Sequence, residues 1–72
     1  MALTKVEAQV TGKVWKIVKH AGDDLGAEDP IVLIECMKLE IPVAAPRAGK
    51  VARVLVKEGD PVREGQVVAE LE

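Results

Sequence analysis

The residue of this 72-residue chain best suited to chemistry is Lys38, in the segment Glu35-Cys36-Met37-Lys38-Leu39-Glu40. A lysine side chain ends in a primary amine, which is a target for covalent modification. The chain's one histidine and one cysteine are too few for a zinc site, and Cys36 lacks a second cysteine for an internal disulfide. A lysine at the tip of a turn is most often simply solvated, so the elements around Lys38 must decide whether its amine has a role.

The segments on either side of Lys38, Ile31–Glu35 and Glu40–Val43, have the composition of strands and predict a β-hairpin. We place Met37 and Lys38 at the two central positions of its turn. The pairs across the hairpin are then Cys36 with Leu39, Glu35 with Glu40, and Ile34 with Ile41. This register puts apolar side chains on one face and the two glutamates on the other.

Two local preferences oppose this hairpin. A two-residue turn favours Asn-Gly or glycine-rich pairs, which adopt positive φ angles easily, and Met37-Lys38 is a poor choice there. Glu35 opposite Glu40 places like charges across the strands. Where local preferences are overruled, a functional demand is expected. The sequence therefore predicts a rigid hairpin whose apex holds Lys38 in water, with Met37 beside it.

The chain also contains an internal repeat. With an offset of 37 residues, residues 6–35 align with residues 43–72 without gaps, and eight of the 30 pairs are identical, against roughly two expected by chance. Residues 36–42 lie between the two copies and form the hairpin. Two copies are too few for a solenoid, so we expect one domain over residues 1–72 whose interlocked halves are related by a pseudo-twofold axis.

Each half has the same order of elements. A glycine opens it, a strand follows at Val14–Lys19 or Val51–Lys57, a Gly-Asp turn comes next, and a second strand closes it at Ile31–Glu35 or Val67–Glu72. We expect five glycines to serve these turns: Gly12, Gly22, Gly49, Gly59 and Gly65. Because helical spacing is nowhere sustained, the expected fold is all-β, with short strands packed as two sheets or a flattened barrel.

Composition narrows the function. Hydrophobic residues make up 49% of the chain but aromatic residues only 1%, so we expect an aliphatic core in which Trp15 is buried or half-buried. So few large side chains make an enclosed substrate pocket hard to build, which disfavours a self-sufficient enzyme. The net charge is −2 without a basic patch, which disfavours nucleic-acid binding. The aliphatic runs are too short to span a membrane and no signal peptide is visible, so the expected setting is cytoplasmic.

These residues together resemble the biotinyl/lipoyl carrier (attachment) domain family, in its biotin carboxyl carrier form. The resemblance covers essentially the whole chain, because the Met37-Lys38 pair, the two Gly-Asp half-repeats and the central lysine coincide. It implies a hammerhead-like flattened barrel of two four-stranded antiparallel sheets. It also implies that biotin is joined covalently to Lys38 by an amide bond, with ligase or partner recognition by the flanking residues: Glu35, Cys36, Met37, Leu39 and Glu40.

The sequence departs from the family pattern in a few places. Cys36 and Leu39 replace residues that are usually alanine and often methionine, and both changes are small and apolar. In the first half, Glu28 stands where the Gly-Asp motif expects a glycine, whereas the second half has Gly65. We therefore expect the first-half turn to differ in shape.

The resemblance implies a non-catalytic swinging-arm carrier that shuttles carboxylate between the biotin carboxylase and carboxyltransferase sites of a biotin-dependent carboxylase. Its implied partners are those two enzymes and biotin protein ligase. Two alternatives stay open: a lipoyl carrier, carrying lipoate for a 2-oxo acid dehydrogenase or related complex, or a dual biotin/lipoyl attachment protein. A third alternative is an unmodified adaptor of the same shape, although such a module would normally lack the lysine.

Overall fold

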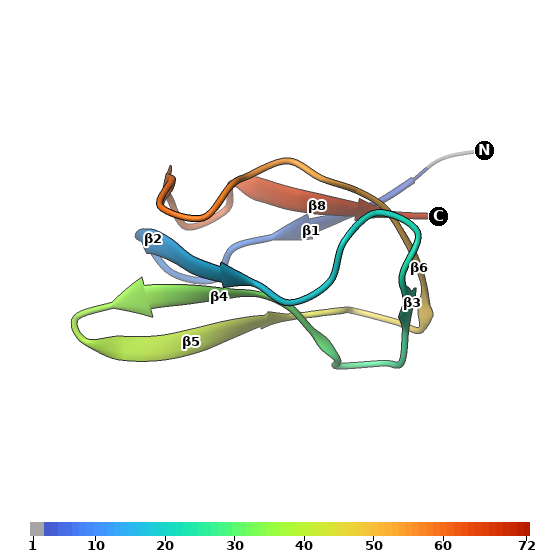
Figure 1. Ribbon diagram of the computed structural model, residues 1–72, viewed down its shortest axis with the longest axis horizontal. Helices are drawn as coiled ribbons and strands as arrows, with labels where there is room; N and C mark the ends of the chain where they lie inside the picture. The colour runs from blue at the N-terminus through green and yellow to red at the C-terminus, as the bar shows by residue number, and fades with distance from the viewer. Residues whose placement is uncertain (1–2) are drawn as a thin grey trace.

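The computed structural model describes residues 3–72, and these residues form eight strands in two four-stranded antiparallel sheets (Figure 1). One sheet has the order β1-β8-β6-β3 and the other β5-β4-β2-β7. The strands are β1 (Thr4–Glu7), β2 (Gly12–Ile17), β3 (Asp24–Leu25), β4 (Pro30–Cys36), β5 (Leu39–Ala44), β6 (Gly49–Val54), β7 (Pro61–Val62) and β8 (Val67–Leu71). The all-β prediction is confirmed. The described residues contain no helix that could cross a membrane.

The pseudo-twofold axis predicted from the repeat is visible in reciprocal hydrogen bonds between the halves. The Gly22 amide donates to the Val51 carbonyl at 2.8 Å, and the equivalent Gly59 amide donates to the Val14 carbonyl at 2.7 Å. Each half therefore completes the other half's sheet. Neither sheet is built from one half alone, and the two copies must fold together.

The space between the sheets is filled by aliphatic side chains, as the composition requires. Fifteen residues are buried: Val6, Ala8, Val14, Leu25, Ile31, Val32, Ile34, Val43, Ala45, Val51, Val56, Val62, Val68, Ala69 and Leu71. Trp15 is not among them and is 48% exposed. It is the extra residue of a β-bulge in β2, where Val14 pairs with Ile34 and Lys16 with Leu33. The expectation that Trp15 contributes to the core was wrong. Trp15 follows the inward-facing Val14, so strand alternation turns its side chain outward, and the bulge leaves Lys16 on the same outer face.

The strands that follow the opening glycines begin and end earlier than expected. We predicted Val14–Lys19, but β2 ends at Ile17, and the amides of Val18 and Lys19 both donate to the Ile31 carbonyl, at 2.8 and 3.1 Å. One carbonyl shared by two amides interrupts the regular ladder.

The expected turn glycines divide into two kinds. Gly22, Gly59 and Gly65 lie in turns with φ angles of 92°, 93° and 87°, a conformation that glycine adopts without steric cost. Gly12 and Gly49 instead begin strands β2 and β6. For these two the turn assignment was wrong. Gly12 lies in a strand where the backbone of Glu35 approaches closely, and Gly49 lies in a strand where the side chain of Arg47 does.

The first-half turn has the same shape as its second-half counterpart, contrary to expectation. Glu28 adopts a φ angle of 68°, in the left-handed region that Gly65 also occupies. The Glu28 amide donates to the Ala45 carbonyl at 2.9 Å, and the Gly65 amide donates to the Ala8 carbonyl at 2.8 Å. These equivalent bonds fix the backbone, so Glu28 accepts a conformation that its side chain disfavours.

We expect Glu28→Gly to stabilise the domain by up to about 1 kcal/mol, since it removes the steric cost of a left-handed non-glycine residue. The reverse change at the equivalent position, Gly65→Glu, is expected to destabilise by about 1 kcal/mol or more. Thermal unfolding checks both, because about 1 kcal/mol corresponds to roughly 4–8 °C in a domain of this size. A lower unfolding temperature for Glu28→Gly would contradict this interpretation of the turn.

Candidate functional site

The hairpin between β4 and β5 has the predicted register. Cys36 pairs with Leu39, Glu35 with Glu40, and Ile34 with Ile41. Only Met37 and Lys38 are left to reverse the chain, and their φ angles are 52° and 67°. Two consecutive left-handed residues define a type I′ turn, which matches the twist of the strands it joins. The apex is therefore a tight, geometrically defined turn built from unfavourable residue types.

Lys38 is exposed at this apex. Within residues 3–72, its amine makes no hydrogen bond and no ion pair. Met37 beside it is 90% exposed and Leu39 is 63% exposed, whereas Cys36 is half-buried. The apolar face of the hairpin thus continues beyond the core. The solvent-exposed Lys38 amine lies next to the exposed apolar side chains of Met37 and Leu39.

The opposite face of the hairpin is acidic near the tip. Glu35 and Glu40 are both exposed and pair directly across the strands. Lys13 of β2 pairs with Glu35 on the other side of β4, but their side chains form no ion pair. The ion pair found within residues 3–72 joins Arg53 and Glu70 in the other sheet. The two glutamates therefore present their charges to solvent on one side of Lys38.

Gly12 supports the base of the hairpin, and sequence analysis missed this role. A Cβ atom at Gly12 would lie 2.4 Å from the Glu35 carbonyl oxygen and 2.8 Å from Cγ2 of Ile34. Glycine is thus required for β2 to approach β4, three residues before Lys38. The glycine at the start of each half-repeat could have indicated a close contact at Gly12. The contacting residue, Glu35, could not be identified because it lies 23 residues further along the chain.

The hairpin forms one end of an elongated molecule. The domain measures 35 × 18 × 17 Å. In Figure 1 the β4–β5 turn lies at one end of the long axis, while β1 begins and β8 ends toward the other. Lys38 is consequently held far from the start of β1 and the end of β8.

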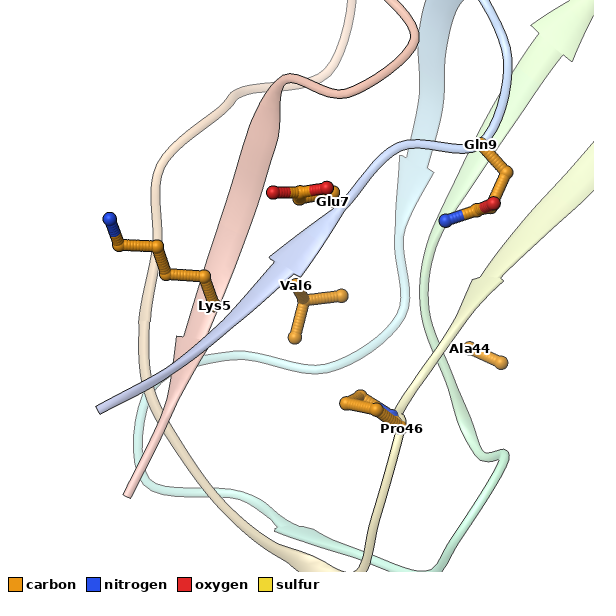
Figure 2. Close-up of a pocket in the computed structure, with 6 residues that line it drawn as sticks. All are labelled: Lys5, Val6, Glu7, Gln9, Ala44 and Pro46. Carbon is orange, nitrogen blue, oxygen red and sulfur yellow. The ribbon is translucent and has the colours of Figure 1, made fainter. Parts of the chain in front are cut away.

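A groove described by the structure lies away from Lys38. It has a volume of about 190 Å³ and is lined by Lys5, Val6, Glu7, Gln9, Ala44 and Pro46. Figure 2 shows it between β1 and the end of β5, with Val6 on one side and Pro46 on the other. The volume is below the roughly 300–1,000 Å³ typical of small-molecule sites. The described residues also contain no cluster of metal-ligating side chains.

An amine on a stiff, protruding turn is accessible to other proteins and is suited to hold an attached group. The fold and the hairpin place the domain in the class of swinging-arm carriers. Comparison with known proteins then identifies the family within this class.

The sequence profile of the family described as Biotin-requiring enzyme matches residues 2–71. The biotin/lipoyl attachment protein of Bacillus subtilis is 44% identical over 66 residues, covering 92% of this chain and 90% of that protein. The biotinylated protein TB7.3 homolog of Mycobacterium leprae is 42% identical over 64 residues, covering 89% of this chain and 90% of that protein. The urea carboxylase of Kluyveromyces lactis has a similar structure, with a TM-score of 0.94 and 38% identity over 100% of this chain and 6% of that one.

The chain belongs to this biotin/lipoyl family of carrier domains. It matches nearly the full length of two small relatives but only 5% of a longer relative such as the pyruvate carboxylase of Aspergillus niger. The resemblance recognised from the hairpin and the repeat is thereby confirmed.

We expect Gly12→Ala to destabilise the domain by about 1–3 kcal/mol, because the added methyl group displaces the backbone of β4. Gly49→Ala is the matched control at the equivalent position. A Cβ atom there meets the Arg47 guanidinium at 2.5 Å and backbone only at 3.4 Å. Because a side chain can move more easily than a strand backbone, a smaller loss is expected. Urea unfolding measures both, and equal losses would refute the support assigned to Gly12.

Proposed function

We propose that this chain is a biotin carboxyl carrier domain whose biotin is attached covalently to Lys38. The observation that carries the proposal is the exposed amine of Lys38 at the apex of a type I′ turn, between two interlocked half-repeats. The family assignment supports biotin as the cofactor.

The described residues fit an attached arm. Among residues 3–72 the Lys38 amine has no hydrogen-bond or ion-pair partner, so its acylation breaks no such contact there. In the attachment step, the Nζ lone pair of Lys38 attacks the activated carboxyl carbon of biotin. A C–N bond forms, the amine gives up its proton and the activating group departs with its oxygen. Attached biotin supplies a ureido nitrogen that carries carboxylate.

The domain itself would perform no chemistry on the substrate of a carboxylase. The extended arm reaches on the order of 10–15 Å from the backbone, since it contains about ten bonds of roughly 1.5 Å. A stiff turn keeps that reach directed outward, and tethering raises the local concentration of the ring to roughly the millimolar range. The partners of such a domain are biotin carboxylase and carboxyltransferase, together with the biotin protein ligase that modifies Lys38.

Recognition at the tip would use the side chains around Lys38. Met37 and Leu39 offer exposed apolar surface, and Glu35 and Glu40 offer charge on one side. Cys36 is a half-buried free thiol, as expected of a small packing residue.

Lipoate is the second candidate cofactor. The printed name of the Bacillus subtilis relative includes both biotin and lipoyl attachment. A dual attachment protein would use the same Lys38 amine, because lipoate also carries a carboxyl group that forms an amide. The test of function therefore includes both cofactors.

We expect the unmodified domain to gain one biotinyl group when incubated with biotin protein ligase, biotin and ATP, as measured by intact mass. Lys38→Arg is expected to abolish the gain, whereas Lys50→Arg, an exposed lysine of β6, keeps it. Labelling of Lys38→Arg would refute the site. Labelling of the wild type by lipoyl ligase and lipoate alone would replace biotin with lipoate as the cofactor.

We expect Met37→Asn to stabilise the domain by about 0.5 kcal/mol, because asparagine tolerates the left-handed first position of a type I′ turn. The same variant is expected to be a poorer substrate for biotin ligase, because it lacks the exposed thioether. Thermal unfolding and the rate of labelling measure the two effects. A variant that is more stable and is labelled at the wild-type rate would exclude Met37 from recognition.

A further inference from the structure

The outer faces of the two sheets differ although the pseudo-twofold axis relates them. The sheet that carries the hairpin has three apolar residues on its outer face: Trp15, Leu33 and Pro42. The equivalent positions, at the offset of 37 residues, hold Ala52, Glu70 and Lys5. The fold therefore does not require apolar side chains at these positions, and another demand must account for them.

Strand register places the three apolar residues side by side. Leu33 pairs with Pro42 of β5 and with Lys16 of β2. Trp15 is the bulge residue that shares the position opposite Leu33. Because Leu33 lies two residues from exposed Glu35, it faces the same side of the sheet. Trp15 is 48% exposed, Pro42 is exposed and Leu33 is half-buried; together they form the outer patch.

The outer patch lies on the same face of the sheet as the acidic row of the hairpin. The row of Glu35 and Glu40 lies directly between the patch and the turn. Pro42 is four residues from Lys38, about 13 Å along an extended strand. Lys13 and Lys16 are exposed along the β2 side of the patch, and neither has an ion-pair partner within residues 3–72.

The short reach of the unmodified lysine side chain limits how far from the hairpin a modifying enzyme can bind. A bare lysine side chain reaches roughly 6 Å, so an enzyme that acylates Lys38 has to contact the hairpin and the sheet behind it. A standard interface covers about 800 Å² per partner, a disc of about 30 Å across. Centred near the hairpin, such a disc includes the outer patch. A protein that meets the finished arm can stay further away.

We propose that the outer patch is the docking surface for biotin protein ligase, and that the ligase covers it with apolar side chains bordered by carboxylates opposite Lys13 and Lys16. The ligase then covers the outer face of this sheet and not the equivalent face of the other sheet, which carries the Arg53–Glu70 ion pair. This inference rests on the proposed attachment of biotin to Lys38.

The test uses the pseudo-symmetry of the fold. The double variant Trp15→Ala with Leu33→Glu installs the residues that the equivalent positions already hold, and the new glutamate lies opposite Lys16 as Glu70 lies opposite Arg53. In steady-state biotinylation of the full unmodified chain, we expect KM for the domain to rise at least about tenfold, with kcat within about twofold of wild type.

Leu55→Ala is the matched control, since Leu55 is 47% exposed and follows β6 in the other sheet. It should leave KM unchanged. Should the double variant fail to fold, the pair Lys13→Glu and Lys16→Glu takes its place. It leaves the core untouched and should raise KM at low salt, with a smaller effect at high salt.

An unchanged KM in the folded double variant, with normal labelling of the wild type, overturns the docking surface and leaves the attachment site intact. A wild-type chain that no biotin ligase labels overturns both proposals. Amide NMR shifts on titration of the unmodified domain with ligase give an independent readout. Shifts in β2, β4 and β5 support the outer patch, whereas shifts confined to β6 and β8 overturn it.

Discussion

The register of strand β4 is the constraint on which the rest of the domain depends. β4 lies between β5 and β2, and its residues Ile31, Val32 and Ile34 are completely buried. A shift of one residue would turn Val32 and Ile34 toward solvent, so the core permits a single register. Once Cys36 is paired with Leu39, two residues remain for the reversal. Their left-handed conformations follow from the core, whatever their types prefer.

Burial of the apolar core offsets the backbone strain of the left-handed residues. A left-handed conformation costs a non-glycine residue of order 1–3 kcal/mol, and three such residues occur in residues 3–72: Glu28, Met37 and Lys38. Burial of one valine or isoleucine contributes roughly 1.5–3 kcal/mol. Fifteen apolar residues are buried between the sheets, and the reciprocal hydrogen bonds make each half depend on the other. A turn of unfavourable residues is therefore sustained by the whole domain.

Local patterns predicted the hairpin and its register, because alternation of apolar and acidic residues within ten positions was sufficient. The repeat predicted the interlocked halves for the same reason. What could not be predicted depends on contacts between distant segments. Gly12 is required by the backbone of Glu35, and a bulge that the sequence pattern does not predict places Trp15 and Lys16 together on the outer face. Glu28 follows Gly65 in shape because equivalent hydrogen bonds fix both turns, although only one has the expected glycine.

The two ends of the long axis differ in structure: one end is the protruding hairpin, and at the other end a side chain links two strands. At the end opposite the hairpin, Arg47 ties β1 to β8, since its Nη2 donates to the Glu72 carbonyl at 2.7 Å and to Thr4 Oγ1 at 2.9 Å. A tether attached at that end would make the whole rigid body a lever. Pivoting there, a body 35 Å long sweeps its far tip through an arc wider than the lysine arm alone could cover. With such a tether, the protein would add its own length to the travel of a group attached at its tip.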